Sequence, residues 1–147
     1  MRIDGAFQVA APLEKVWAAL LDAQTLASCV PGAGDVRAVG ATRYEGTLKA
    51  RIGPIAATFA LTGDVAADEE SHRYTVDVKG RERLTGTVVQ ARFGAALQAE
   101  RGGTHADYSF DLTLLGRLGQ IGQAVLQDVA RKMTAHTVEC LQARLGG

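Results

Sequence analysis

The stretch 26-LASCVPGAGDV-36 ends a helical pattern and begins a strand pattern within a few residues. Pro31 has no backbone N–H with which to continue a helix, and it restricts Val30 to extended conformations. Gly32 and Gly34 tolerate positive φ values, so the chain can turn sharply here. We therefore expect a helix to end at this turn and a sheet to begin beyond it, with apolar residues at the junction.

Upstream of this turn the sequence predicts one strand and then helix. Alternation places one face of the strand at Ile3, Gly5, Phe7 and Val9. Residues 11–29 begin with Pro12, which a first helical turn accepts at no cost in hydrogen bonds. Helical spacing then repeats at Leu13, Val16, Trp17 and Leu20. The chain thus leads from a strand into a pair of short helices that ends at the turn.

Downstream, residues 43–115 alternate with a period of two, which predicts half-buried strands. Inward positions on this phasing include Tyr44, Leu48, Ala50, Ile52, Ile55, Ala57, Phe59, Leu61, Val65, Tyr74, Val76, Val78, Ala106, Tyr108, Phe110, Leu112 and Leu114. Glycine-rich or acidic turns separate successive strands, as at 69-EESH-72 and 100-ERGGTH-105. An antiparallel meander is the topology that needs the fewest long connections.

From Arg117 to about Ala143 the period changes to 3.6. One apolar stripe is predicted at Leu118, Ile121, Val125, Leu126, Val129, Met133, Cys140 and Leu141. Such a helix is roughly 40 Å long, enough to cross a whole sheet. We expect an α+β fold in which a curved antiparallel sheet of about seven strands wraps around this helix. Residues 1–147 are predicted to form a single domain, because no repeat or linker divides them.

Composition limits the classes of function. The chain has 147 residues, of which 47% are hydrophobic, so one sizeable core is possible. Sixteen basic and sixteen acidic residues cancel, and no Lys/Arg run stands out, so we expect no nucleic-acid partner. Neither a signal peptide nor an apolar run of membrane-spanning length is visible. Cys29 and Cys140 have no disulfide or zinc-site spacing and are predicted to be reduced thiols in a cytoplasmic protein.

The order of elements resembles the helix-grip fold of the START-like superfamily. Four stretches resemble the CoxG family of carbon monoxide dehydrogenase in particular: 7-FQVAAPLEKVWAALLDAQTLASCVPG-32, 44-YEGTLKARIGPIAATFALTGDV-65, 102-GGTHADYSFDL-112 and 116-GRLGQIGQAVLQDVARKM-133. The run from Cys29 to Gly32 and the hairpin residues Gly53 and Pro54 are the most specific parts. The strand pattern alone would fit any START-like domain.

The resemblance implies a hydrophobic cavity between the sheet and the long helix. It also implies service to a molybdenum-containing CO dehydrogenase-type enzyme, through handling of a quinone electron acceptor or through peripheral contact with the inner face of the membrane. Some relatives carry a C-terminal extension for membrane contact; this chain ends at 143-ARLGG-147, so we expect no anchoring by a tail. No covalently bound cofactor is expected, and a quinone, isoprenoid or lipid is the expected ligand.

The residues give a separate reason to expect a cavity. Many inward positions are small, among them Gly46, Gly63, Ala91 and Ala95, and a close-packed interior must either draw the helix near or leave room for something else. Both alternatives stay open. The predicted lining is Cys29, Val30, Pro31, Tyr44, Leu48, Phe59, Leu61, Tyr74, Val76, Phe93, Leu97, Tyr108, Phe110, Ile121, Val125, Val129 and Met133. Cys29, Val30 and Pro31 are expected at one mouth.

Signals for catalysis or metal binding are weak. Gly116, Gly119 and Gly122 do not match a dinucleotide-binding loop; they predict a smooth or loose helix start, with a flexible lid as the alternative. His136 falls on the helical apolar stripe, and no histidine pair with a carboxylate assembles, so no metal site or catalytic residue is predicted. A noncatalytic binder is the favoured function. A polyketide cyclase or dehydratase-like enzyme and an assembly factor remain as alternatives, since fold alone does not separate them.

Overall fold

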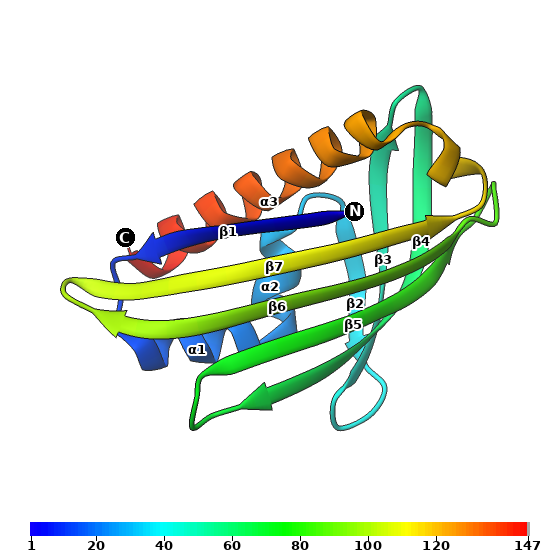
Figure 1. Cartoon of the computed structure of the whole chain (residues 1–147). Helices are drawn as coiled ribbons and strands as arrows, with labels where there is room; N and C mark the ends of the chain where they lie inside the picture. The colour runs from blue at the N-terminus through cyan, green and yellow to red at the C-terminus, as the bar shows by residue number, and fades with distance from the viewer. Residues whose placement is uncertain (147) are drawn as a thin grey trace.

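The computed structural model describes residues 1–146. Its elements follow the order β1 (Arg2–Val9), α1 (Leu13–Leu21), α2 (Ala23–Cys29), β2 (Ala33–Ala38), β3 (Arg43–Ile52), β4 (Ile55–Asp68), β5 (Arg73–Glu82), β6 (Val88–Glu100), β7 (Gly103–Leu115), the 3₁₀ helix η1 (Arg117–Gln120) and α3 (Gln123–Gly146). Figure 1 shows a curved sheet with the long helix α3 lying along it beside β1. The predicted α+β helix-grip architecture is therefore confirmed.

The sheet is antiparallel throughout, and its seven strands follow the order β1-β7-β6-β5-β4-β3-β2. Strands β2 to β7 form a meander, as predicted, while β1 pairs with β7 at the far edge. The two short helices therefore carry the chain from one edge of the sheet to the other. The register also confirms the predicted inward positions, since Tyr44 lies opposite Gly63 and Phe93 opposite Phe110.

The predicted helical pair is divided at Asp22, which ends α1 and begins α2. The Asp22 carboxylate accepts hydrogen bonds from the N–H groups of Gln24 (3.0 Å) and Thr25 (3.3 Å). These bonds satisfy two of the free N–H groups at the start of α2. Pro12 precedes α1 as its N-cap, so its missing N–H costs no hydrogen bond there.

The turn at residues 30–32 ends α2 and starts the sheet. The N–H of Val30 donates to the carbonyls of Leu26 (3.1 Å) and Ala27 (3.3 Å), and Pro31 prevents a further turn of helix. Gly32 adopts φ 82° and its carbonyl accepts the N–H of Lys49 at 2.9 Å. A Cβ at position 32 would collide with the Lys49 carbonyl oxygen. The glycine is therefore required by both its conformation and the close approach of β3.

Replacing Gly32 by alanine is expected to lower the free energy of unfolding by about 3 kcal/mol or more, because it combines a left-handed backbone with a backbone collision. Gly102→Ala is the matched control: its φ is 86°, but nothing lies within 4 Å of the added Cβ. The control should cost only ~1 kcal/mol. Urea denaturation of both variants measures the difference, and equal losses would contradict the collision.

The apolar core is divided into two clusters at opposite ends of the sheet. The first cluster contains Val9, Ala11, Val16, Trp17, Leu20, Cys29, Tyr74, Ala95, Leu97, Ala106 and Leu141. The second cluster contains Ile52, Ala57, Phe59, Val89 and Leu118. The short helices and the C-terminal half of α3 close the first end, while the β3–β4 hairpin and η1 close the second. Helix α3 is thus supported at both ends.

The long helix begins later than predicted. Residues 117–120 form η1, and α3 starts at Gln123. Gly116 (φ 125°) and Gly122 (φ 117°) flank η1 in conformations that an α-helix does not contain. The prediction that these glycines form a helix surface or helix start is therefore wrong, because they are needed at the bends of a linker. His136 and Val125 are exposed, so the predicted apolar stripe was too wide. No helix within residues 1–146 is long and apolar enough to span a membrane.

A buried carboxylate fixes the turn between β5 and β6. Glu82 is 2% exposed, and its carboxylate accepts the N–H groups of Thr58 (2.9 Å), Leu84 (3.0 Å) and Thr85 (2.8 Å). The hydrogen bond from Thr58 is the main reason that the pKa of Glu82 falls from 4.5 to about 2, despite the opposing effect of burial. Thr87 extends the network by accepting the N–H of Leu118 at 3.1 Å. The turn is therefore tied to both β4 and η1.

Because the pKa of Glu82 is lower in the folded chain, its contribution to stability is complete above pH 4.5 and is lost as the pH falls towards 2. The excess stability of the parent over Glu82→Gln should be constant near neutral pH and should shrink across this acidic range. Denaturant unfolding at a series of pH values measures it. Glu69→Gln, at an exposed turn, is the control and should show no such trend; a parallel trend would contradict the assignment.

Candidate functional site

Between the two core clusters lies a set of inward apolar side chains that belongs to neither. This middle zone consists of Tyr44, Val78, Phe110, Val129 and Met133, each of which is only half-buried. The first three face inward on β3, β5 and β7, and the other two lie on α3. Apolar groups that face the concave side of a sheet and yet remain accessible indicate a space that the protein itself does not fill.

The contacts of α3 explain why this zone stays open. The helix packs closely against β1, β3 and α2, which form the rim of the sheet and one end of it. Figure 1 shows β1 directly beside α3, with the broad surface of β5, β6 and β7 continuing beyond it. A straight helix that rests on the rim of a curved sheet leaves a gap over the deepest part of the curve.

The predicted lining residues divide into four groups. Tyr44, Phe110, Val129 and Met133 lie in the middle zone. Cys29, Tyr74 and Leu97 are buried in the first cluster, against which Val76, Phe93 and Tyr108 pack. Phe59 is buried in the second cluster, against which Leu48, Leu61 and Ile121 pack. Val30 and Pro31 are half-buried at the turn after α2, and Val125 is exposed on the first turns of α3.

A row of four aromatic rings crosses the inner face of the sheet beside the middle zone. It runs from Phe7 on β1 through Tyr108 on β7 and Phe93 on β6 to Tyr74 on β5, and neighbouring ring centroids are 6.0–6.3 Å apart. The rings of Phe93 and Tyr108 are stacked with an interplanar angle of 23°. Such a row offers flat, polarisable surface to a planar ligand.

Phenol groups provide polar atoms in this otherwise apolar surrounding. Burial, and to a smaller extent the neighbouring Tyr44, raises the pKa of Tyr74 to about 12. Its hydroxyl therefore stays protonated at neutral pH and is able to donate a hydrogen bond. Tyr44 and Tyr108 face the same side of the sheet and are half-buried. Together these side chains suit a ligand that is mostly apolar but carries a hydrogen-bond acceptor.

A pocket of about 360 Å³ opens between β1 and α3. Its lining consists of Arg2, Ile3, Asp4, Tyr108, Arg131, Thr134 and Ala135. Arg2 is engaged by Asp4 at 3.0 Å, whereas Arg131 makes no ion pair within the described part of the chain. A Cβ on Gly5 would collide with the Tyr108 hydroxyl, so this glycine is what allows the ring to lie against β1. Tyr108 thus joins the polar pocket to the aromatic row.

A larger hollow, of about 650 Å³, lies on the other face of the sheet. Its side chains come from β2, β3 and β4 together with Arg83, and they include Asp35, Arg37, Glu45, Thr47 and Thr62. Arg37, Glu45 and Thr62 alternate with the inward residues of their strands, so they face away from α3. This open hollow is polar and is unconnected with the middle zone.

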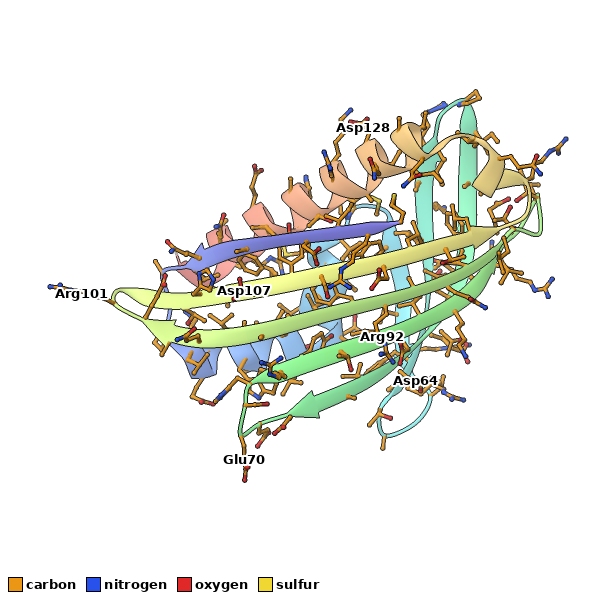
Figure 2. All side chains as sticks on the ribbon, in the orientation of Figure 1. Asp64, Glu70, Arg92, Arg101, Asp107 and Asp128 are labelled. Atoms are coloured by element: carbon orange, nitrogen blue, oxygen red, sulfur yellow. A yellow bond between two sulfur atoms is a disulfide. The ribbon has the colours of Figure 1, made fainter. Side chains whose placement is uncertain are left out.

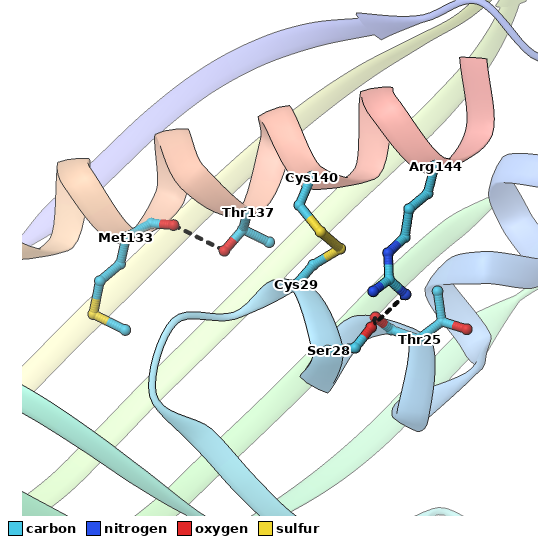
Figure 3. Close-up of a disulfide and its surroundings, with 7 residues drawn as sticks. All are labelled: Thr25, Ser28, Cys29, Met133, Thr137, Cys140 and Arg144. Atoms are coloured by element: carbon cyan, nitrogen blue, oxygen red, sulfur yellow. Dashed lines mark hydrogen bonds between the residues drawn. A yellow bond between two sulfur atoms is a disulfide. The ribbon is translucent and has the colours of Figure 1, made fainter. Parts of the chain in front are cut away.

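The two cysteines are joined in a disulfide, which corrects the prediction of free thiols. Cys29 at the end of α2 bonds to Cys140 on α3, with 5.5 Å between the Cα atoms and 111 residues between them in sequence. Figure 3 shows the bridge beside a hydrogen bond of 2.6 Å from Arg144 to the Ser28 hydroxyl. Spacing alone hid the pair, because the contact arises only when α3 returns to the short helices. The pairing also removes the cysteine argument for a reducing compartment.

Reduction of the disulfide is expected to destabilise the fold, because it releases a closed loop of 111 residues. The chain-entropy model gives about 4 to 5 kcal/mol for a loop of this length. The double variant Cys29→Ala/Cys140→Ala should show this loss in urea denaturation with and without dithiothreitol. Only the parent should respond to the reductant. A parent whose denatured form contains two titratable thiols before reduction would contradict the bridge.

The described residues contain no group of three or more His, Cys, Asp or Glu side chains placed to hold a metal ion. Sequence reasoning missed three features near the site: the disulfide, the buried Glu82 and the polar pocket with Arg131. Arg131 could have been found by placing the polar face of the C-terminal helix beside the first strand, but the pairing of β1 with β7 was needed to do so.

Comparison with solved structures confirms the class of fold. A conserved protein from Geobacillus kaustophilus matches with a TM-score of 0.88 at 20% identity, covering 99% of this chain and 95% of that chain. The Zhui aromatase/cyclase from Streptomyces sp. R1128 has a TM-score of 0.73 at 13% identity, with coverages of 99% and 93%. A START superfamily protein from Mycobacterium smegmatis has a TM-score of 0.70 at 13% identity, with coverages of 98% and 96%. The fold is therefore START-like.

A family model narrows this class. Residues 5–146 match the family model for CoxG of carbon monoxide dehydrogenase, so the chain belongs to the CoxG family. No curated protein matches the sequence. The family resemblance of the motifs around Cys29–Gly32 and Gly53–Pro54 is thus confirmed over nearly the whole chain.

Proposed function

We propose that this protein is a noncatalytic carrier that binds a hydrophobic ligand with a planar, polar head group, such as a quinone with an isoprenoid tail. The observation that carries the proposal is the middle zone: inward apolar side chains from β3, β5, β7 and α3 that neither core cluster covers. Burying each methylene group of a ligand there contributes ~0.8 kcal/mol. An isoprenoid or acyl chain therefore supplies enough affinity without any catalytic group.

The head group is assigned to the aromatic row and the adjoining pocket. Stacking on Phe93 and Tyr108 suits a flat ring, and the phenol of Tyr74 remains a donor because its pKa is about 12. Carbonyl oxygens of a quinone accept hydrogen bonds, and both tyrosine hydroxyls and the guanidinium of Arg131 donate them. The tail then extends along the middle zone beneath Val129 and Met133.

Membership of the CoxG family supports a partner of the molybdenum-containing CO dehydrogenase type. In this proposal the carrier brings a membrane-dwelling electron acceptor to that enzyme, with peripheral contact at the inner face of the membrane. The middle zone itself consists of apolar and phenolic side chains, without a carboxylate or imidazole that could act as a general acid or base. This composition favours carriage over cyclase chemistry at that position.

The test is binding of menaquinone-4 and ubiquinone-2, followed by native mass spectrometry and by the fluorescence of Trp17, the single tryptophan of the chain. Val129→Glu should weaken binding at least about tenfold, since it places a charge in the middle zone. Val125→Glu is the matched control one turn earlier on α3, at an exposed position (37% exposed), and should leave affinity unchanged.

Circular dichroism of both variants checks that they fold. Two results would overturn the proposal: a folded parent protein that binds neither quinone, or equal weakening by the two substitutions. In the first case an assembly factor without a ligand, and then a cyclase, would become the better interpretation of the family fold.

A further inference from the structure

Positive charge gathers at the end of the sheet that carries the β5–β6 turn. We call this surface the basic end; it consists of Lys49, Arg51, Lys79, Arg81, Arg83 and Arg117 around Leu84 and Leu115. It holds six of the sixteen Lys and Arg residues of a chain whose formal net charge is zero. The cations are distributed over separate strands, so no run of basic residues marks them in the sequence.

Strand register places these cations on neighbouring positions of one face. Lys49 lies opposite Thr58, whose carbonyl accepts the N–H of Arg83 at 2.8 Å. Arg81 lies opposite Ala60, and Lys79 lies opposite Thr62. All these positions alternate with inward residues, so the cations face away from α3. Arg117 begins η1, immediately beyond the end of β7.

The cations of the basic end are not neutralised by the protein. The ion pairs of the described residues use Arg2, Arg37, Arg43, Arg92 and Lys132, together with two histidines, and none uses a cation of the basic end. Glu82, the acidic residue within the turn, is buried and engaged by N–H groups. Asp35 and Glu45 lie across the outer hollow from Arg83, and Glu45 already pairs with Arg37 at 3.3 Å.

Exposed apolar side chains lie within the same surface. Leu84 is 84% exposed and Leu115 is 52% exposed, and they are two of the four large hydrophobic residues with high exposure. Leu84 stands on the turn that Glu82 fixes through the N–H groups of Leu84 and Thr85. A leucine held outward on a rigid turn loses little conformational freedom when it becomes buried against a partner.

Exposed acidic residues collect at the opposite end of the sheet. The turn between β4 and β5 contains Asp68, Glu69 and Glu70. Figure 2 shows Glu70 and Arg101 at the end of the sheet away from η1. The molecule is therefore electrically polarised along its long direction, although its net charge is zero. Such a distribution orients one end towards a negatively charged partner and turns the other end away.

We propose that the basic end docks onto an anionic lipid bilayer, with Leu84 inserted among the head groups and the surrounding arginines and lysines on the phosphates. An exposed leucine within a collar of unpaired cations fits a surface that is apolar beneath and anionic above. A polyanion without an apolar interior would gain nothing from Leu84. This inference deepens the proposed function and rests on it only for its purpose, since a quinone carrier must reach the bilayer.

The test is cosedimentation of the full chain, without added ligand, with vesicles of phosphatidylcholine alone or mixed with phosphatidylglycerol. We expect binding only to the mixed vesicles, weakening as salt is raised. Arg81→Glu/Arg83→Glu should lower the partition coefficient at least about twentyfold, because each Lys or Arg near an anionic surface contributes roughly fivefold. Leu84→Ala should lower it about tenfold through lost apolar burial.

Matched controls keep these effects specific. Arg73→Glu/Arg101→Glu makes the same change of charge at the opposite end, and Val39→Ala truncates an exposed apolar residue (44% exposed) outside the basic end; neither should change partitioning more than about twofold. Equal losses in the two charge variants would overturn the proposal, as would binding to pure phosphatidylcholine.

An acidic protein or nucleic-acid partner predicts a different result. Binding to heparin or duplex DNA as strong as binding to the mixed vesicles, and insensitive to Leu84→Ala, would overturn lipid docking. Quinone binding from detergent solution is measured separately and does not involve the basic end. A protein that binds quinone but not vesicles would therefore contradict the docking surface alone, whereas one that binds vesicles but no quinone would contradict the proposed carrier function alone.

Discussion

The pairing of the first strand with the last is the constraint on which the rest of the structure depends. Eight residues of β1 pair with β7, from Arg2 opposite Asp111 to Val9 opposite Thr104. Because β1 lies at one edge and β2 at the other, the two short helices must cross beneath the sheet between them. That crossing creates the first core cluster, and it also provides the surface to which the end of α3 is bonded.

Support for α3 at its ends, rather than along its length, is what leaves room for a ligand. The disulfide and the first cluster hold the C-terminal part of the helix, and η1 with the second cluster holds its beginning. Glycines at positions 116 and 122 allow the chain to bend twice before the helix starts. The inward side chains between these supports have no partner across the gap, so they stay accessible and apolar. Stability and ligand access thus come from different parts of one helix.

Most of the fold could be predicted because strand alternation records which side chain faces inward. Tyr44, Phe93 and Phe110 were placed on the inner face from the period alone, and the register confirms them. The helix start was misplaced, since Gly116 and Gly122 fit a helical period but adopt bends. His136 was assigned to the apolar stripe for the same reason, because the angular width of a stripe depends on what covers it. The ligand and the membrane surface remain predictions.

By itself the sequence determined the type of each element, the inward faces of the strands, the glycine turn at position 32 and the family motifs. These are local properties, set by side-chain period and by the φ values that proline and glycine accept. Tertiary structure decided which distant groups meet: Cys29 with Cys140, Glu82 with the N–H of Thr58, and the scattered cations of the basic end. Such meetings depend on how the sheet curves and which edges pair, and no period within a single element records them.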